Sequence, residues 1–218
     1  MRRYEAVLLD VDGTLIDSND AHARAWCDAF AACDREVPYS RIRMLIGMGG
    51  DALVEHLTGL PRDSRDTKKL QHAHAEHFKR EVPKLAPIVG ARQLVLHLLR
   101  EGYRFAVATS SGADQLSLLL EAAGVADLCE LRTTADDVDA AKPEPDVIRA
   151  AIHELGVDCS RAVLIGDTPY DIEAATRAGV ETIGFTSGGF SKESLGGAIA
   201  VFEGPADLVA SWARSPLA

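Results

Sequence analysis

The 218-residue sequence predicts an α/β fold in which a doubly wound parallel sheet carries a helical insertion. Short apolar runs of strand length alternate with amphipathic helical patterns along most of the chain. Such alternation is typical of parallel strands joined by right-handed helical crossovers. Residues 17–86 break this rhythm, because they carry helical spacing with few strand signals. We therefore expect a core made of residues 1–16 and 87–218, with an all-helical insert over 17–86.

Each expected strand is a short apolar run bounded by residues that favour turns, as in buried parallel strands. The runs cover residues 6–9, 105–108, 162–165, 181–185 and 198–202. The helical patterns that alternate with them cover 91–100, 113–123, 145–155 and 171–178. Each of these four patterns is followed by a glycine where a C-terminal cap is expected: Gly102, Gly124, Gly156 and Gly179. Within the insert we expect helices over 19–32, 39–46, 51–60 and 63–82.

Composition and charge exclude several classes of function. The net charge of −10 opposes nonspecific binding to nucleic acid or to an anionic membrane surface. No run of about 18 consecutive apolar residues is present, so we expect no membrane-spanning helix. The four cysteines form no C-x-x-C pair, and the N-terminal segment lacks the apolar region of a signal peptide. We therefore expect a cytoplasmic protein whose thiols are reduced.

Polar residues follow three of the expected strands, at the edge where open parallel sheets bind ligands. The three segments are Asp10-Val11-Asp12-Gly13-Thr14, Thr109-Ser110-Ser111-Gly112 and Gly166-Asp167-Thr168-Pro169-Tyr170-Asp171. Several carboxylates that share one site repel one another unless a cation lies between them. Mg²⁺ relieves this repulsion, because it prefers oxygen ligands and accepts carboxylates together with a phosphate oxygen. The sequence therefore predicts a site for Mg²⁺ and a phosphate group.

The residue types at this edge indicate individual roles. We expect Asp10 and Asp167 to bind Mg²⁺, and Asp171 to be a further ligand or to support the ligands. Lys142, just ahead of a helix start, supplies a fixed positive charge. Thr109 and the backbone N–H of Ser110 are expected to hold the phosphate oxygens. The neighbouring Ser111 is instead expected to cap the helix that follows it.

Four segments resemble, in order, the four motifs of the haloacid dehalogenase-like hydrolase superfamily. They are LLDVDGTL, the threonine that closes FAVAT, the lysine of KPEPD, and GDTPYD after VLI. Any one of these motifs is weak alone, but all four follow strand-like runs and together span nearly the whole chain. The resemblance implies a Rossmann-like core with a helical cap inserted after the first strand. Within the superfamily, the chain resembles the branch of phosphoglycolate phosphatase and β-phosphoglucomutase.

The resemblance also implies catalytic roles. Asp10 would attack phosphorus and form an aspartyl-phosphate, and Asp12 would be the general acid and then the general base. Mg²⁺ would be bound by Asp10, the backbone carbonyl of Asp12, and Asp167. The residues expected to contact substrate are Thr109, Ser110, Gly13, Thr14, His22 and Gly47. We therefore expect an Mg²⁺-dependent phosphatase that hydrolyses a small phosphorylated metabolite, of the sugar phosphate or phosphoglycolate type.

Other chemistries of the superfamily fit the sequence less well. The dehalogenases lack the second aspartate of the first motif, which is present here as Asp12. Phosphonate-cleaving relatives use a cap lysine, and the cap stretch 45–51 contains none. A non-catalytic binding module would be expected to have lost one of the acids or the lysine.

A phosphosugar mutase like β-phosphoglucomutase is the main alternative. The run DSNDAHARAW resembles the hinge and first cap helix of the mutase, with His22 able to approach Asp12. The mutase binds a second phosphate with a lysine and an arginine of the cap, and this chain has Ile46 and Gly50 at those places. This difference favours hydrolysis.

Two further expectations concern the cap and the assembly. His72, His74 and His77 lie on one expected helix, and we interpret them as a solvated helix face rather than a metal site. The sequence is compatible with a monomer or a homodimer, and it does not identify the substrate.

Overall fold

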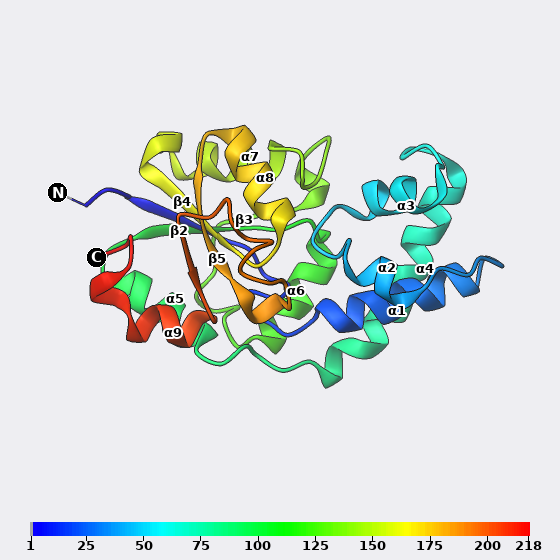
Figure 1. The fold of residues 1–218 in the computed structure, drawn as a ribbon, viewed down its shortest axis with the longest axis horizontal. Coiled ribbons are helices and arrows are strands. Elements are labelled where there is room, and N and C mark those ends of the chain that lie inside the picture. The colour runs from blue at the N-terminus through cyan, green and yellow to red at the C-terminus, as the bar shows by residue number, and fades with distance from the viewer. Residues whose placement is uncertain (1) are drawn as a thin grey trace.

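The computed structural model describes residues 2–218 and contains a six-stranded parallel sheet with helices on both faces (Figure 1). The strand order is β3-β2-β1-β4-β5-β6, and every neighbouring pair is parallel. The strands are β1 (Ala6–Leu9), β2 (Arg104–Ala108), β3 (Arg132–Thr133), β4 (Ala162–Gly166), β5 (Glu181–Phe185) and β6 (Ala200–Phe202). The predicted doubly wound sheet is confirmed.

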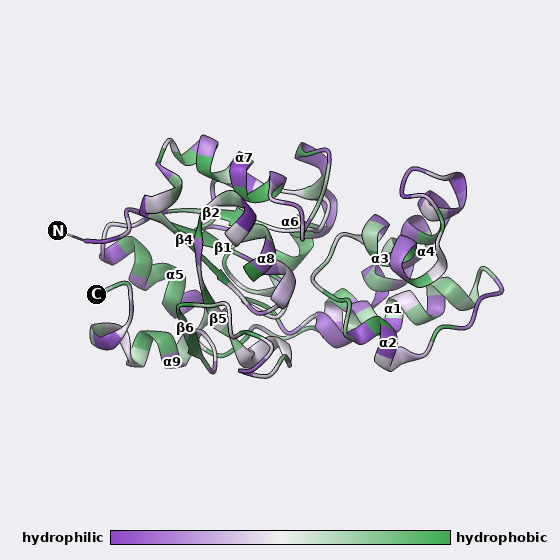
Figure 2. Cartoon of the chain, turned by 45° about the horizontal axis from the view of Figure 1, so that its top comes forward, coloured by the Kyte–Doolittle hydropathy of each residue, from purple (hydrophilic) through white to green (hydrophobic). Residues whose placement is uncertain are grey.

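The two faces of the sheet are covered by different helices. Along β1, Val7 and Leu9 pack toward α5 (Ala91–Arg100), α6 (Ala113–Ala122) and α9 (Pro205–Ala210). The alternate residues Ala6 and Leu8 pack toward α7 (Asp146–Leu155) and α8 (Pro169–Ala178). Successive side chains of a strand point to opposite faces, so both faces require apolar residues. The hydrophobic colouring of the strands in Figure 2 reflects this burial on both sides.

The strand order brings the loops after β1 and β4 together. From β1 the chain builds outward through β2 and β3, and it then returns to the other side of β1 as β4. Such a reversal of strand order is where open α/β sheets bind ligands. The backbone N–H of Asp10 donates to the carbonyl oxygen of Ile165 at 2.9 Å, which joins the ends of these two strands. The side chains that leave both strands therefore meet at one place.

The segment between β1 and β2 forms a separate helical unit beside the sheet, which we call the cap (Figure 1). It contains α1 (Asn19–Ala31), α2 (Tyr39–Arg43), α3 (Gly50–Thr58) and α4 (Arg65–Glu81). These helices share their own apolar cluster, which includes Trp26, Phe30, Leu53 and Leu70. The α5 helix then leads back into the core. The core with a helical insertion after the first strand agrees with the predicted fold.

Two linkers connect the cap to the core, and they run side by side. The N–H of Asp17 donates to the carbonyl oxygen of Ala86 at 3.0 Å, and the N–H of Ile88 donates to that of Leu15 at 3.0 Å. These contacts lie near the expected limits of the cap, and the division at 17 and 86 stays a prediction.

Among the strands and α-helices, β3 and α9 were not predicted, and both are short. The predicted helix at 171–178 begins two residues earlier, at Pro169, and the predicted helix at 39–46 ends at Arg43. Gly156 and Gly179 end α7 and α8 in the left-handed conformation, with φ of 60° and 77°, as predicted. Within residues 2–218, no helix combines the length and the apolar character needed to cross a membrane.

Candidate active site

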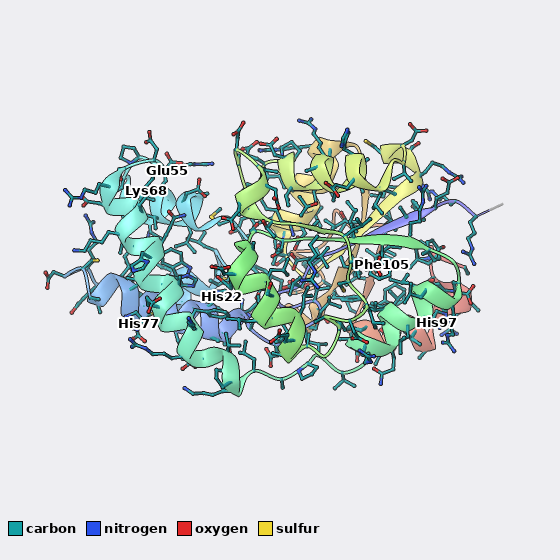
Figure 3. The ribbon with its side chains drawn as sticks, turned by 180° about the vertical axis from the view of Figure 1, so that it is seen from behind. His22, Glu55, Lys68, His77, His97 and Phe105 are labelled. Atoms are coloured by element: carbon teal, nitrogen blue, oxygen red, sulfur yellow. The ribbon has the colours of Figure 1, made fainter. Side chains whose placement is uncertain are left out.

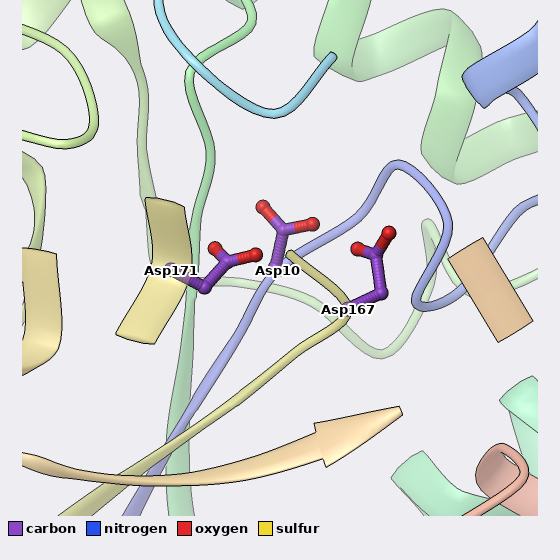
Figure 4. A group of neighbouring side chains, drawn as sticks. All are labelled: Asp10, Asp167 and Asp171. Atoms are coloured by element: carbon purple, nitrogen blue, oxygen red, sulfur yellow. The ribbon is translucent and has the colours of Figure 1, made fainter. Parts of the chain in front are cut away.

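Three buried aspartates gather beyond the carboxyl ends of β1 and β4 (Figure 4). Asp10 follows β1, Asp167 follows β4, and Asp171 lies in the first turn of α8. One carboxylate oxygen from each lies within 4.8 Å of those of the other two. The structure thus brings together the three side chains from which a metal site was expected.

Lys142 is the cation of this cluster. Its Nζ lies 2.5 Å from Oδ1 of Asp10 and 2.7 Å from Oδ1 of Asp171, and the side chain is 1% exposed. Burial lowers the pKa of Lys142, but the two carboxylates outweigh it and raise this pKa above its ordinary value. The other oxygen of Asp171 accepts hydrogen bonds from the N–H and Oγ1 of Thr168, at 3.0 and 2.6 Å. Asp171 thus accepts three hydrogen bonds, one of them from a cation, so this residue is better placed to fix Lys142 than to bind a metal.

The remaining charge around Lys142 is negative. Burial raises the pKa of Asp10 to about 8; the carboxylates of Asp171 and Asp12 add to the shift, and Lys142 opposes it. Burial and the charges of Asp10 and Asp171 also raise the pKa of Asp167 well above its ordinary value. A single lysine cannot balance these carboxylates, whereas a hard divalent cation can. A set of donors made only of oxygen fits Mg²⁺.

The position of Asp167 is fixed from both sides. Oγ1 of Thr14 donates to Oδ1 of Asp167 at 3.1 Å, and Nδ2 of Asn19 donates to Oδ2 at 2.9 Å. A Cβ atom on Gly188 would lie only 1.6 Å from Oδ2 of Asp167, so the loop after β5 must approach without a side chain. The Oδ1 atom of Asn19 is buried and has no hydrogen-bond partner among the described residues. An unpaired buried oxygen beside Asp167 is expected where water or an ion binds.

The carboxylate of Asp12 is held by three side chains. Its Oδ1 accepts from Oγ of Ser18 at 2.5 Å and lies 3.0 Å from Nε2 of His22. Its Oδ2 accepts from Oγ of Ser111 at 3.1 Å. Burial raises the pKa of Asp12, but the charge of His22 and these hydrogen bonds outweigh it, so this pKa falls below its ordinary value. In this arrangement Asp12 is ionised and able to accept a proton.

His22 belongs to a stack of rings inside the cap. Its Nδ1 lies 3.2 Å from Nε2 of His74, and its ring stacks on Phe78 with centroids 3.7 Å apart. The ring of His74 stacks in turn on Trp26 at 4.2 Å. Figure 3 shows that His22 lies where the cap meets the core.

The prediction of a solvated histidine face is wrong for His74. This side chain is 8% exposed and lies on the buried stripe of α4, with Leu70 and Phe78 four residues away on either side. Burial and the neighbouring His22 lower the pKa of His74 well below its ordinary value, so it is neutral. His72, by contrast, is exposed, as expected for a solvated face.

A cavity of about 570 Å³ lies between the cap and the core. Of the residues selected from the sequence, its wall contains Asp10, Asp12, His22, Gly47, Thr109 and Ser110. The others are buried behind that wall: Gly13, Thr14, Lys142, Asp167 and Asp171. Thr14, which was expected to contact substrate, instead directs its hydroxyl to Asp167.

The cap closes over the cavity through its loop before α3. The carbonyl oxygen of Gly47 accepts from Oγ of Ser110 at 3.4 Å, and the N–H of Gly49 donates to the carbonyl oxygen of Lys142 at 2.8 Å. Gly47 has φ of 108°, and a Cβ atom there would lie 2.6 Å from Cγ2 of Thr168. Only glycine fits this close approach of the cap to the core.

Sequence reasoning missed several contacts at the site. The prediction that Ser111 caps α6 is wrong, because Gly112 is the N-cap residue and Ser111 contacts Asp12. Ser18 and Asn19 were not selected, although they lie only three and four residues after the end of the first motif. Their position at the entry to the cap was the available signal.

Comparisons with known proteins agree with this geometry. A sequence model of haloacid dehalogenase-like hydrolases matches residues 7–185. The validoxylamine A 7'-phosphate phosphatase of Streptomyces hygroscopicus subsp. limoneus is 32% identical over 187 residues, which cover 84% of this chain and 86% of that protein. The phosphoglycolate phosphatase of Rhodospirillum rubrum is 31% identical over 215 residues, 94% of this chain and 89% of that protein. The crystal structure of a hydrolase from Pseudomonas syringae has a TM-score of 0.90 and 30% identity, and it covers 96% of this chain and 98% of its own.

Proposed function

The chain belongs to the haloacid dehalogenase-like hydrolases and is a phosphatase of that family, and on this premise we propose that it acts through a phosphoenzyme on Asp10, with Mg²⁺ as cofactor. One observation carries the proposal. Asp10 and Asp12 both line the cavity, and each is held by different side chains, Asp10 by Lys142 and Asp12 by His22, Ser18 and Ser111. Two carboxylates in such different surroundings are suited to two different roles.

The reaction has two steps. In the first, the ionised Asp12 takes the proton that the monoanionic ester brings with it. A carboxylate oxygen of Asp10 then bonds to phosphorus, the bond between phosphorus and the leaving oxygen breaks, and Asp12 passes its proton to that oxygen. In the second, water attacks the same phosphorus, Asp12 takes a proton from the water, and the bond to Asp10 breaks. This covalent route divides one difficult transfer into two easier ones. Lys142 keeps Asp10 oriented and balances part of its charge throughout.

The metal and the phosphate use the residues around these two. Asp10, the backbone carbonyl of Asp12, and Asp167 would hold Mg²⁺, which neutralises charge on the transferring phosphoryl group. We assign Asp171 to holding Lys142, and Thr14 with Gly13 to supporting Asp167. Thr109, Ser110 and the loop at Gly47 are left to bind the phosphate oxygens and enclose them, which excludes water from the first step.

The substrate is a small phosphomonoester. The names of two relatives refer to a phosphate of validoxylamine A and to phosphoglycolate. The cavity of about 570 Å³ accommodates an alcohol as large as a sugar beside the phosphate. A phosphorylated sugar, or a similar small alcohol, is therefore the class that we propose.

A phosphosugar mutase is less well supported. Such an enzyme must hold a second phosphate in the cap while the sugar turns over inside the site. Ile46 and Gly50 line the cavity where the mutase has cations, and the described residues of the cavity wall include no arginine. A non-catalytic module is also disfavoured, because the acids and the lysine are all present and paired at the site.

The test uses the purified protein with 4-nitrophenyl phosphate and Mg²⁺. Asp10→Asn and treatment with EDTA should each abolish hydrolysis, whereas Asp17→Asn, at an exposed position beside the first motif, should leave it intact. Full activity after either treatment would exclude the proposed mechanism. Incubation with β-glucose 1-phosphate and a trace of the bisphosphate tests the mutase: glucose 6-phosphate formed without free phosphate would favour it.

A further inference from the structure

The cavity wall beyond the reacting groups carries mostly negative charge. Four carboxylates line it away from Asp10 and Asp12: those of Asp51, Glu76, Asp114 and Asp136. They come from α3, α4, the start of α6 and the segment after β3, so they surround the space from both the cap and the core. One side chain among the lining residues, that of Lys79, carries an ammonium group.

In the described part of the chain the four carboxylates are not held in ion pairs, although the hydrogen bond to Glu55 and, after it, the charge of Asp51 contribute to raising the pKa of Arg62. Within residues 2–218, none of the four carboxylates forms a salt bridge. Oδ2 of Asp136 accepts a hydrogen bond from the N–H of Ala113 at 2.7 Å, which leaves its charge in place. Of the histidines that line the cavity, His74 is held neutral by burial, and His22 is paired with Asp12. Among the lysines, arginines and acids that line the cavity away from Asp10 and Asp12, one lysine therefore faces four carboxylates.

The rest of this wall is apolar. Trp26, Met48, Leu53, Phe78 and Leu118 contribute to it, mainly from the cap. Apolar side chains bind a carbon skeleton, and they also lower the local dielectric constant, which strengthens the effect of nearby charges. A cleft lined by one sign of charge concentrates ligands of the opposite sign. The phosphate group of the substrate is also negative, but Lys142, beside Asp10, offsets part of its repulsion from these carboxylates.

From this distribution we propose that the enzyme selects phosphomonoesters whose alcohol part bears no negative charge, and that it prefers an alcohol bearing a protonated amine. This inference rests on the proposed function and narrows it. An amino sugar phosphate or another phosphorylated amino alcohol fits the wall, because the amine meets carboxylates and the carbon skeleton meets apolar side chains. A leaving group that carries a carboxylate, as in phosphoglycolate, or a second phosphate meets repulsion from both the cap and the core.

The experiment compares three aryl phosphates that differ only in charge. The phenyl phosphates bear a para aminomethyl, methyl or carboxymethyl group, in which the CH₂ keeps the reactivity of the leaving phenol similar. At low ionic strength, kcat/KM should fall in that order, with the amine favoured over the carboxylate by about tenfold or more. The ratio should shrink as salt is added, because most of the carboxylates lie at the open rim. Equal rates, or a preference for the carboxylate, would overturn the inference.

Variants identify the groups responsible. Asp51→Asn, Glu76→Gln and Asp114→Asn should each reduce the ratio of amine to carboxylate by about two- to threefold. Glu154→Gln, which removes an exposed charge of α7 outside the cavity, should leave it unchanged. An equal effect of Glu154→Gln would show that overall charge, and not the cavity, sets the preference, and would overturn the inference.

A binding measurement separates this inference from the proposed function. Calorimetric titration of Asp10→Asn, loaded with Mg²⁺, measures the affinity for the same three esters without turnover. Affinities in the predicted order, with no hydrolysis by the wild-type protein, would contradict the proposed function and support the charge preference. Hydrolysis of all three esters by the wild-type protein, with affinities in the reverse order, would support the proposed function and contradict the charge preference.

Discussion

Nε2 of His22, on the first helix of the cap, lies 3.0 Å from Oδ1 of Asp12, in the first loop of the core. The proposed proton carrier is therefore oriented by a residue of the inserted unit, not by the core alone. The contact is partly buried, and His74 supports His22 from behind at 3.2 Å. Closure of the cap and the orientation of Asp12 are thus linked.

Removal of this contact should slow the chemistry. In His22→Ala, Asp12 loses one of its three side-chain partners, so we expect kcat to fall by about 10²-fold with a smaller change in KM. The fall should be largest for alkyl phosphates, whose leaving groups depend most on protonation. Steady-state kinetics with an alkyl and an aryl phosphate give the comparison. His77→Ala, on α4 and outside the cavity, is the control. An unchanged kcat in His22→Ala would contradict a positioning role.

Lys142 should matter for stability as well as for activity. In Lys142→Met, Asp10 and Asp171 lose a buried ionic partner, so the free energy of unfolding in Mg²⁺-free buffer should fall by about 3–5 kcal/mol. Urea denaturation measures this change. Lys68→Met, on the exposed side of α4 (Figure 3), should have little effect. Equal stability of Lys142→Met and the wild type would show that the ion pairs of Lys142 contribute nothing to the free energy of unfolding.

Binding of Mg²⁺ should depend on the loop after β5. At a concentration of 100 times Kd, the ion should stabilise the wild type by about 2.7 kcal/mol, which thermal denaturation detects. Gly188→Ala should lose most of this gain, because its Cβ atom would displace the Oδ2 atom of Asp167. Gly204→Ala is the matched control, since its Cβ atom would have no neighbour closer than 3.5 Å. If Mg²⁺ stabilised Gly188→Ala as much as the wild type, this result would argue against Asp167 as a ligand of the ion.

Because of His74, we expect the protein to lose stability in mild acid. Its pKa is lower in the folded protein than the 6.5 of an ordinary histidine, because it is buried and lies beside His22. Below about pH 6.5 the unfolded chain therefore binds a proton that the folded protein does not. The contribution of His74 to the free energy of unfolding is fully present above that pH. It falls with decreasing pH, by at most about 1.4 kcal/mol per pH unit, until the pH passes the pKa of His74 in the folded protein.

The comparison of variants isolates this contribution. His74→Gln keeps a polar side chain but does not titrate, so its free energy of unfolding should decline less between about pH 6.5 and pH 5.5 than that of the wild type. His72→Gln, at an exposed position on the same helix, should follow the wild type. Parallel decline in all three proteins would show that His74 is not held neutral.

The core of the fold was predictable because its signals are local. Strands such as β1 and β4 are buried on both faces and appear as continuous apolar runs, and helix ends such as Gly156 are marked by glycine. The edge strand β3 has two residues, Arg132 and Thr133, and no apolar run to reveal it. Its existence depends on pairing with β2, which is a tertiary contact.

The site was predictable to the extent that motifs mark it. Asp10, Asp12, Lys142 and Asp167 could be selected because each lies in a motif, and the order of the strands then explains why they meet. His74 could not be placed in the same way, because its contacts with His22 and Trp26 depend on how α4 packs against α1. The signal in the sequence is the spacing, since His74 lies four residues from both Leu70 and Phe78 and therefore on the same buried face of α4.

The most direct test of the account is whether the phosphoryl group rests on Asp10 during turnover. Asp12→Asn should slow release of the phosphoryl group more than its transfer from 4-nitrophenyl phosphate, whose leaving group needs little protonation. After an acid quench, mass spectrometry of the peptides should find one phosphoryl group on Asp10, and none in a protein that also carries Asp10→Asn. A phosphoryl group on another residue, or phosphate release by Asp12→Asn with no phosphorylated peptide, would contradict the account.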